Sequence, residues 1–512
     1  MINIADAFER VVDRIPDREA VVCGERRLSY RALDDRATQL AHWLAEHGVG
    51  HGDDVAIYCR NGPEYLEAML AAFKIRAVPI NVNYRYQKAE LTYLFRDSDP
   101  KSVIAAAEFA ADARTAAPRA AVLTVGIEYE AALARQSSAR DFAPRSPDDE
   151  YILYTGGTTG YPKGVIWRHE DIFFAALGGP RLADVTDAEE VGRRAERGGQ
   201  ARFLLLSPLM HGAAHWGAFN ALFGGHTIVL DDQQGFDAER ALRLSASEGI
   251  TAIGLVGDAF ARPLGEALVT FTGDLPKLQT VLSGGALLSE TVKEQLVRRL
   301  PGLTILDGYG SSETGAQGHA IGDASGGRPR FVIGSDTLVI DDYQRAVAPG
   351  SGRVGKLARR GHVPLGYRGD PDRTARTFPV IDGVRWAITG DDAVVELDGS
   401  IALLGRGSSC INTGGEKVYP DEIEAALKKH PDVADAIVVG IPHPRWGQQV
   451  AAVLEARPDT AVAADDIRAH VRAHLADYKV PRTIVFVPSV SRSPAGKADL
   501  LWARRVVETA TQ

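Results

Sequence analysis

Residues 154–164 read YTGGTTGYPKG and combine glycines, threonines and one lysine in a short segment. Glycines let successive backbone N–H groups turn toward an anion, threonine hydroxyls add donors, and Lys163 adds a positive charge. A Walker loop needs Gly-Lys-Ser/Thr at the start of a helix, whereas Lys163 stands between Pro162 and Gly164. The segment is therefore either a phosphate-binding loop of another type or a mobile turn, and its composition favours neither.

The segment HGAAH places His211 and His215 four residues apart, which is a spacing of zinc ligands on a helix. Glycine stands where the HExxH motif has glutamate, and no third ligand is evident in the sequence, so we exclude a metal at this pair. Small residues follow at helical spacing, at Ala214, Gly217 and Ala218. They could clear space for a ligand or let two helices pack closely, and the spacing is compatible with both.

Length and composition limit the class of protein. The 512 residues predict several folding units, and the formal charge of -9 argues against a nucleic-acid backbone as the main partner. Three cysteines without a CxxC pair predict neither a disulfide framework nor a cysteine zinc site, which favours a reduced compartment such as the cytoplasm. Charges interrupt the apolar spacing of residues 1–20, and no apolar run is long enough to cross a membrane, so we expect neither a signal peptide nor a transmembrane segment.

Short apolar runs alternate with helical patterns from about residue 28 to residue 400. Runs at 54–59, 202–208 and 278–285 predict strands and residues 288–300 predict a helix, which together indicate an α/β architecture. After residues 403–415 the pattern changes to a helix, two strands, a helix and a last strand. A small α+β domain of about 100 residues that begins near residue 409 fits the usual size of domains.

Further segments extend the phosphate hypothesis through their order along the chain. After YTGGTTGYPKG come PLMHG (208–212), SGGALL (283–288), GYGSSETG (308–315), WAITGD (386–391), GRGSSCINTGGEKVYPDEIE (405–424) and RSPAGK (492–497). In this order and spacing they resemble the motifs of the adenylate-forming superfamily of acyl-CoA synthetases, luciferases and peptide-synthetase adenylation domains, over nearly the whole chain. Longer stretches, including GDAFARPL and YKVPR, resemble actinobacterial acyl-CoA ligases for long-chain or steroid side-chain acids.

The resemblance implies both a function and a fold. The function is that of an ATP-dependent carboxylic acid:CoA ligase, which forms an acyl-adenylate and then a thioester on a fatty or bulky alicyclic or steroid-type acid. ATP, Mg²⁺ and CoA are expected to take part, and a homodimer is compatible with the resemblance. The fold is α/β, with a large N-terminal adenylation domain (1–407) of sheets flanked by helices and a small mobile α+β C-terminal domain (408–512) after a hinge near 407–409.

Two rival functions stay open. The acyl group could pass to a carrier protein or an amine instead of CoA, and the absence of a fused carrier domain within the 512 residues favours CoA only slightly. A non-catalytic nucleotide-binding regulator could keep the fold, because a fold does not fix a function. The presence of Lys497, Glu313 and Asp391 disfavours the regulator.

The resemblance also implies positions for the nucleotide. Because a carboxylate must attack the α-phosphate of ATP, the site has to supply cations and oriented donors. The β- and γ-phosphates would be held by Thr155, Gly156, Gly157, Thr158, Thr159, Gly160 and Lys163. Adenine would lie against Gly284, Gly285, Ala286, Asp307, Gly308 and Tyr309. Ser312 would donate to the α-phosphate, while Asp391, with Arg406 close by, would accept the ribose hydroxyls.

Catalytic and binding roles follow from the same resemblance. Lys497 would reach the α-phosphate and the carboxylate oxygens, Glu313 would hold Mg²⁺, and Thr159 would act on the phosphates. An acyl pocket would be formed by His211 at its mouth and by Ala214, Gly217 and Ala218. The passage for the pantetheine arm of CoA would include Gly414 and Gly415, and its phosphates would meet Lys479, Arg445 or Arg482.

Two positions depart from the usual pattern of the family. Gly156 stands where serine is common, which removes one hydroxyl donor, and Ser408 stands where the hinge usually carries aspartate or lysine. Glycine and serine at 407–408 are still able to absorb a backbone rotation.

Overall fold

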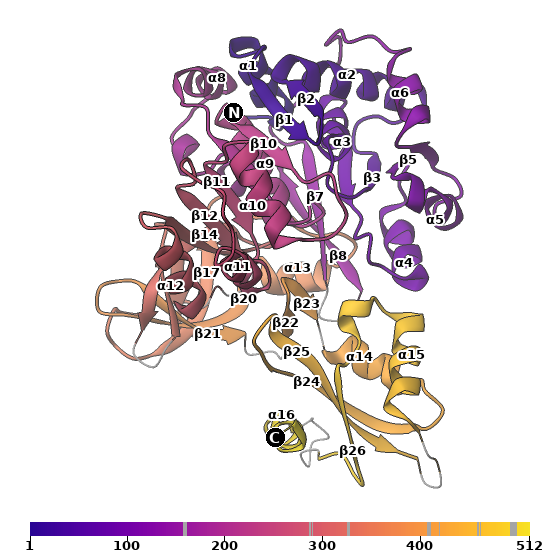
Figure 1. Ribbon diagram of the computed structural model, residues 1–512, viewed down its shortest axis with the longest axis vertical. Helices are drawn as coiled ribbons and strands as arrows, with labels where there is room; N and C mark the ends of the chain where they lie inside the picture. The colour runs from indigo at the N-terminus through magenta and orange to yellow at the C-terminus, as the bar shows by residue number, and fades with distance from the viewer. Residues whose placement is uncertain are drawn as a thin grey trace.

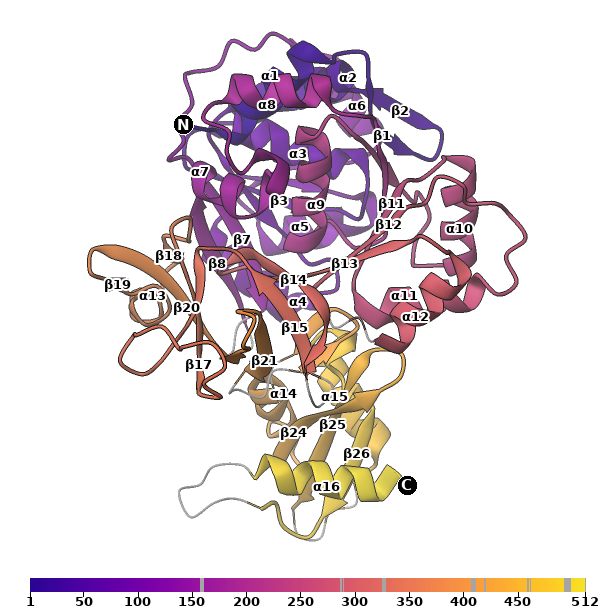
Figure 2. The ribbon, with the colours of Figure 1, turned by 90° about the vertical axis from the view of Figure 1, so that its left-hand side faces the viewer.

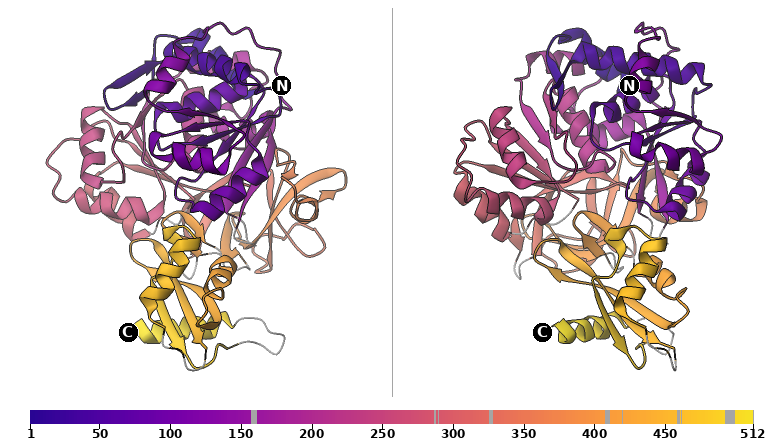
Figure 3. Two further views of the ribbon diagram at one scale, coloured as in Figure 1. Left: turned by 90° about the vertical axis from the view of Figure 1, so that its right-hand side faces the viewer. Right: turned by 45° about the vertical axis from the view of Figure 1, so that its right-hand side comes forward.

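The computed structural model describes residues 1–156, 161–285, 288, 290–324, 328–406, 411–418, 420–457, 460, 462–491 and 499–511. Figure 1 shows a large body that holds the chain up to β21 and a smaller body formed by the C-terminal elements. The views of Figures 2 and 3 show the same separation, with the small body at one end of the molecule. The expected fold class, α/β with a large N-terminal region and a smaller α+β region, is confirmed.

The largest sheet has a parallel centre that antiparallel strands continue. Along its path the strand order is β16-β17-β20-β21-β15-β14-β13-β12-β11-β9-β10-β1-β2, and β19 pairs with β20. The run from β13 to β1 is parallel throughout. The strands are β1 Glu19–Cys23, β2 Arg26–Ser29, β9 Arg202–Leu205, β10 Thr227–Leu230, β11 Ala252–Leu255, β12 Thr280–Gly284, β13 Thr304–Ser311, β14 Gly315–Ala324, β15 Arg328–Ile333, β16 Thr337–Ile340, β17 Val354–Arg360, β19 Val380–Ile381, β20 Val384–Val395 and β21 Ile401–Arg406.

Two smaller sheets complete the large body. One is parallel, in the order β4-β3-β5-β6, with β3 Asp54–Tyr58, β4 Val78–Asn81, β5 Ser102–Ala105 and β6 Ala121–Thr124. The other is antiparallel, in the order β18-β8-β7, with β7 Glu150–Gly156, β8 Pro162–Arg168 and β18 Gly366–Tyr367. Asn81 joins the two sheets, because its side chain donates to the Tyr154 carbonyl at 2.9 Å and accepts from the Tyr154 amide at 2.7 Å.

Helices cover the sheets of the large body. Apolar residues of α1, α2, α3 and α9 share one hydrophobic core, in which Phe8, Leu40, Leu70 and Phe219 are fully buried. The helices are α1 Ile4–Arg14, α2 Tyr30–Glu46, α3 Pro63–Lys74, α4 Lys88–Ser98, α5 Ala110–Ala116, α6 Ile127–Leu133, α7 His169–Ile172, α8 Ala188–Arg197, α9 Gly212–Phe223, α10 Ala238–Ser247, α11 Gly257–Ala267, α12 Glu290–Arg299 and α13 Pro371–Thr377.

The small body is a sheet with helices on both faces. Its strand order is β23-β22-β25-β24, with β26 paired to β25. Ile423 and Ile467 of α14 and α15 pack on one face, and Ala503 and Val507 of α16 pack on the other. The elements are β22 Ile411–Thr413, β23 Glu416–Val418, α14 Pro420–Leu427, β24 Val433–His443, β25 Gly447–Ala456, α15 Ala464–His474, β26 Thr483–Val487 and α16 Leu500–Thr511.

The described residues on either side of the glycine-rich segment belong to two paired strands. Strands β7 and β8 pair antiparallel, so that Gly156 lies opposite Pro162 and Thr155 opposite Lys163. The segment therefore returns as a strand and does not open a helix, which agrees with the exclusion of a Walker loop. Residues 157–160 lie outside the described part of the chain.

Candidate active site

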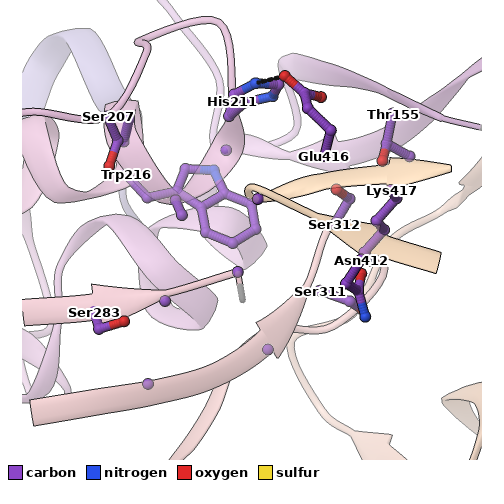
Figure 4. A pocket seen from close by; sticks show the side chains of 18 of the residues that line it. Thr155, Ser207, His211, Trp216, Ser283, Ser311, Ser312, Asn412, Glu416 and Lys417 are labelled. Carbon is purple, nitrogen blue, oxygen red and sulfur yellow. Dashed lines mark hydrogen bonds and ion pairs between the residues drawn. The ribbon is translucent and has the colours of Figure 1, made fainter. Parts of the chain in front are cut away.

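A cavity of about 1210 Å³ lies where the large body meets the small body. Its wall draws on α9, on the ends of β11, β12 and β13, on β20 and on the small sheet, and Figure 4 shows several of its side chains. The residues of the wall that the sequence predicted as site residues are Thr155, His211, Ala214, Gly217, Gly284, Gly285, Asp307, Gly308, Tyr309, Ser312, Asp391, Gly414, Gly415 and Lys479. The fold thus collects residues of the motifs within the described part of the chain around one space.

The small residues of α9 divide between the cavity and the core. Ala214 and Gly217 belong to the wall, and a Cβ atom added to Gly217 would meet no atom within 4 Å. Ala218, four positions after Ala214, is fully buried in the hydrophobic core and is not among the residues of the wall. The role of Ala218 in the acyl pocket therefore stays a prediction, and Ala214 and Gly217 are the predicted small residues that line the cavity.

Lys163 lies beside a buried carboxylate. Its Nζ atom is 3.1 Å from Oε1 of Glu313 and donates to the hydroxyl oxygen of Tyr367 at 3.1 Å. The Tyr367 hydroxyl in turn donates to Oε1 of Glu313 at 3.0 Å. Burial and the Glu313 charge raise the pKa of Tyr367, so the phenol stays protonated at neutral pH. Glu313 is only 5% exposed, and the adjacent cation and hydroxyl compensate its carboxylate for the lost hydration.

Asp391 is held in place from two sides. It lies inside β20, and its Oδ2 atom accepts from the hydroxyls of Tyr309 at 2.9 Å and Thr389 at 2.7 Å. Tyr309 belongs to β13, so this bond links the two strands at the wall of the cavity. In the register of β20 and β21 the partner of Asp391 is Arg406, whose side chain lies outside the described part of the structure.

Glycines open the ends of β12 and β13 to the cavity. Gly284 lies opposite Gly308, and a Cβ atom on Gly284 would meet only the Gly308 carbonyl oxygen, at 3.7 Å. Gly285 has a φ of +84°, in the left-handed region that favours glycine. A flat ligand can therefore approach this backbone closely. Asp307, in the same wall, lies 3.4 Å from the ammonium of Lys293.

Glu416 of the small body contacts two basic side chains of the large body. Its Oε1 atom lies 3.0 Å from Nε2 of His211, the contact dashed in Figure 4, and 2.8 Å from Nη1 of Arg85. Glu416 is 6% exposed. Burial raises the pKa of the Glu416 carboxyl, but His211, Arg85 and Lys479 outweigh burial and hold this pKa below its ordinary value. Glu416 is therefore an anion at neutral pH and joins the two bodies through charge.

The small body also supplies one side of the cavity. Gly414 and Gly415 have φ values of +58° and +86°, and a Cβ atom on Gly415 would lie within 2.4 Å of Val256 in the large body. The guanidinium carbon of Arg482 lies 3.7 Å from the ring centre of Trp446, which is part of the wall. Lys479 is part of the wall too, but its ammonium points to Glu90 of α4.

Several predicted residues lie outside the described part of the chain. They are Gly157, Thr158, Thr159 and Gly160 of the phosphate loop, Ala286, the hinge 407–409 with Ser408, and Lys497. Their roles stay predictions.

The sequence reasoning missed four residues of this region. Glu416 stands inside the segment GGEKVYP, so its carboxylate was visible, but no pattern pointed to its partner Arg85. Tyr367 follows a loop that contains no recognised motif. Trp216 directly follows the histidine pair, which was considered only as a possible metal site. Within the described ranges, no group of three or more His, Cys, Asp or Glu could hold a metal ion.

Two family models together match most of the chain. The AMP-binding enzyme model matches residues 8–367, and the AMP-binding enzyme C-terminal domain model matches residues 422–497. The chain belongs to the AMP-binding enzyme family. The recognition of this family from its motifs is confirmed, and the cavity with its glycine-lined wall is the candidate active site of an AMP-binding enzyme.

Two relatives of this AMP-binding enzyme are named as CoA ligases. It is 44% identical to the medium/long-chain-fatty-acid–CoA/3-oxocholest-4-en-26-oate–CoA ligase of Mycobacterium tuberculosis, over 99% of this chain and 96% of that one. It is also 44% identical to the 3-oxocholest-4-en-26-oate–CoA ligase of Rhodococcus rhodochrous, over 98% and 95%. The amide bond synthetase McbA of Marinactinospora thermotolerans has the same fold, with 25% identity, a TM-score of 0.80 and coverage of 98% and 99%. Among the helices that the structure describes, none is long and apolar enough to span a membrane.

Proposed function

We propose that the protein is an ATP-dependent carboxylic acid:CoA ligase. One observation carries the proposal: a single cavity joins an apolar chamber along α9, a nucleotide chamber with Tyr309 and Asp391, and a side formed by Gly414 and Gly415 of the small body. A two-step acyl transfer needs these three places in contact, because the acyl group stays bound while its partner changes from AMP to CoA.

In the first step a carboxylate oxygen attacks the α-phosphorus of ATP, and the bond to pyrophosphate breaks. Because two anions meet, cations must offset the charge, and Lys163 in the hairpin and Lys497 in the RSPAGK segment are the proposed groups. In the second step the CoA thiol releases its proton to solvent, sulfur attacks the acyl carbon, and the bond from that carbon to the phosphate oxygen breaks, so that AMP leaves. Asp391 orients the nucleotide in both steps by accepting from the ribose hydroxyls.

Glu313 fits the role proposed for it at a magnesium ion. Its buried carboxylate already attracts the Lys163 ammonium and the Tyr367 hydroxyl, which shows a place built around negative charge. Mg²⁺ prefers oxygen ligands and is usually held by one or two carboxylates together with phosphate and water. The ion would offset charge on the phosphates, and this chain would contribute Glu313 to it.

The substrate is proposed to be a fatty or bulky ring-containing acid. Phe203, Leu205, Ala214 and Trp216 give the chamber along α9 an apolar wall, and Gly217 leaves room within it. The names of the two 44% identical relatives include fatty acids and a steroid acid. For CoA, Arg482 and Arg445 are exposed beside Trp446 and are the better candidates for its phosphates, because the Lys479 ammonium is paired with Glu90.

The test is a panel of acids of increasing size with ATP, in which pyrophosphate and AMP are measured with and without CoA. We expect pyrophosphate release with long or ring-containing acids, and sustained AMP release only with CoA. AMP release driven equally by an amine or a carrier protein would favour the alternative acceptors. Lys497→Ala should lower pyrophosphate release by about 100-fold or more while supplied acyl-adenylate and CoA still react, and the exposed Lys429→Ala is the matched control.

A further inference from the structure

His215, the second histidine of the HGAAH segment, contacts other residues than His211 does. It is almost entirely buried, and its Nδ1 atom lies 2.9 Å from the Leu209 carbonyl oxygen. A carbonyl only accepts, so Nδ1 carries the proton and donates it. Burial lowers the pKa of His215 to about 4, so at neutral pH the ring has one N–H, and Nε2 must accept.

Nε2 of His215 accepts from the hydroxyl of Tyr151 on β7. Burial raises the pKa of Tyr151, so this hydroxyl keeps its proton and can donate it. The Tyr151 oxygen in turn accepts from Nε1 of Trp216 at 3.0 Å. Each of these three hydrogen bonds therefore has one possible direction, from Trp216 to Tyr151, from Tyr151 to His215 and from His215 to the Leu209 carbonyl. The indole ring of Trp216 is held by the first of them.

Trp216 stands in the middle of the helix face that lines the cavity. Gly212, Trp216 and Asn220 are four residues apart, so they share one face of α9, and all three belong to the wall. Figure 4 shows the indole among the side chains that line the pocket. The ring lies close over the helix start, because a Cβ atom on Gly212 would be 3.2 Å from its Cε2 and Cζ2 atoms.

The position along the helix sets what the indole can affect. Trp216 lies five positions after His211, but its indole leans back toward the helix start and lies beside Gly212, next to His211. An acid with its carboxylate near His211 therefore meets the indole early, and only a long or ring-containing acid extends past it toward Gly217 and Asn220, which also line the cavity. Beside the indole, Gly217 adds no side chain.

We infer that Trp216 is a specificity-determining residue that limits the width of acids able to extend along α9, and that Tyr151 and His215 are positioning residues that fix its indole. This inference rests on the proposed acid:CoA ligase function. Substitutions at these residues should change how well one acid is used relative to another. They should leave the chemistry of the two steps unaffected.

The experiment compares Trp216→Ala, Trp216→Phe, Tyr151→Phe and the Trp216→Phe/Tyr151→Phe double variant on butanoate, hexadecanoate and a steroid side-chain acid. We expect Trp216→Ala to raise the ratio of kcat/KM for the steroid acid to that for hexadecanoate by about 10-fold or more, with butanoate little changed. Tyr151→Phe should move the same ratio in the wild-type background but not in Trp216→Phe, which has no indole N–H to hold.

Two controls separate specificity from stability. Trp43→Phe changes a tryptophan of α2, and Tyr129→Phe removes a buried hydroxyl that donates to Glu67 at 2.6 Å, both away from the cavity. Neither should move the ratio. An unchanged ratio in Trp216→Ala overturns the role of Trp216, and an equal effect of Tyr151→Phe in both backgrounds overturns the positioning role. If none of the three acids causes the wild type to release pyrophosphate, the proposed function fails. The preference between the steroid acid and hexadecanoate is then measured by the rise in Tm that each acid causes.

Discussion

The ammonium of Lys479 lies 2.6 Å from Oε1 of Glu90, although 389 positions separate the two residues. Both side chains are almost entirely buried. The other oxygen of Glu90 accepts from the Gln87 amide at 3.0 Å and so caps α4, which keeps the carboxylate in place. Together with Glu416 against His211 and Arg85, this pair ties the small body to the large one at two charged points.

These contacts belong to the present arrangement of the two bodies, which places Gly414 and Gly415 at the cavity. Glu416→Gln should therefore lower the conversion of supplied acyl-adenylate and CoA to thioester by about 10-fold, because a hydrogen bond to a charged group contributes about 1.5–3 kcal/mol. Pyrophosphate release from ATP and acid should change little. The control is Lys428→Met, which removes a half-exposed ion pair with Asp435 inside the small body. Equal losses in both half-reactions would contradict a role in the second step alone.

Gly217→Leu should discriminate between acids by size. The new side chain enters open space in the cavity, so kcat/KM for a long acid should fall by about 10-fold or more, while that for a short acid and the Tm should barely move. Ala218→Leu at the next position is the matched contrast, because it overpacks the core at a typical cost of about 1–3 kcal/mol. It should lower the Tm and affect all acids alike. A lowered Tm in Gly217→Leu would place position 217 in the core.

Glu313→Gln should raise the Mg²⁺ concentration needed for half-maximal pyrophosphate release, because one charged oxygen ligand for a hard cation is lost. The amide keeps the shape of the side chain beside Lys163 and Tyr367. A titration of activity against Mg²⁺ at saturating ATP measures the effect. A curve that coincides with that of the wild type would remove Glu313 from the metal site.

The stability of the fold should fall on mild acidification. Burial lowers the pKa of His169 and of His215 to about 4, against about 6.5 in the unfolded chain. Between pH 6.5 and pH 4 the unfolded state binds protons at these histidines and the folded state does not. Their contribution to the free energy of unfolding is therefore complete above about pH 6.5 and is lost as the pH falls toward 4. Each shift corresponds to about 3 kcal/mol at most.

Urea unfolding at pH 7.5 and pH 5 measures this loss. His169→Gln should reduce the difference between the two pH values, because a glutamine does not titrate. His474→Gln, at an exposed position, should leave the difference as it is. A pH dependence that is the same in His169→Gln as in the wild type would show that His169 does not contribute to it.

Much of the fold follows from local sequence patterns. The runs at 54–59, 202–208 and 278–285 became β3, β9 and β12, since buried parallel strands need continuous apolar residues. Helix α16 was not predicted. Its apolar residues Ala503 and Val507 pack on the second face of the small sheet. The pattern of one segment alone does not indicate which face of a sheet is exposed and must be buried by a helix.

The sequence could predict those site residues that stand in contiguous motifs. Glycines and acceptors such as Gly284, Gly308 and Asp391 were found in this way, and they line the cavity. The pair of Arg85 and Glu416 was not, because 331 positions separate its members and only the folded chain brings them together. Ala218 was assigned to the acyl pocket from its spacing, and spacing gives the helix period but not how deeply a residue is buried.

The place of β1 in the large sheet has a consequence for synthesis on the ribosome. The Thr227 hydroxyl of β10 donates to the Glu19 carbonyl of β1, 208 positions earlier in the chain. At about 5–20 residues per second, β1 therefore waits roughly 10 to 40 s for its parallel neighbour. During that time β2, with Arg26 and Arg27, can pair with one edge of β1, so a charged hairpin partner shields that edge from other chains until β10 emerges to cover the opposite one.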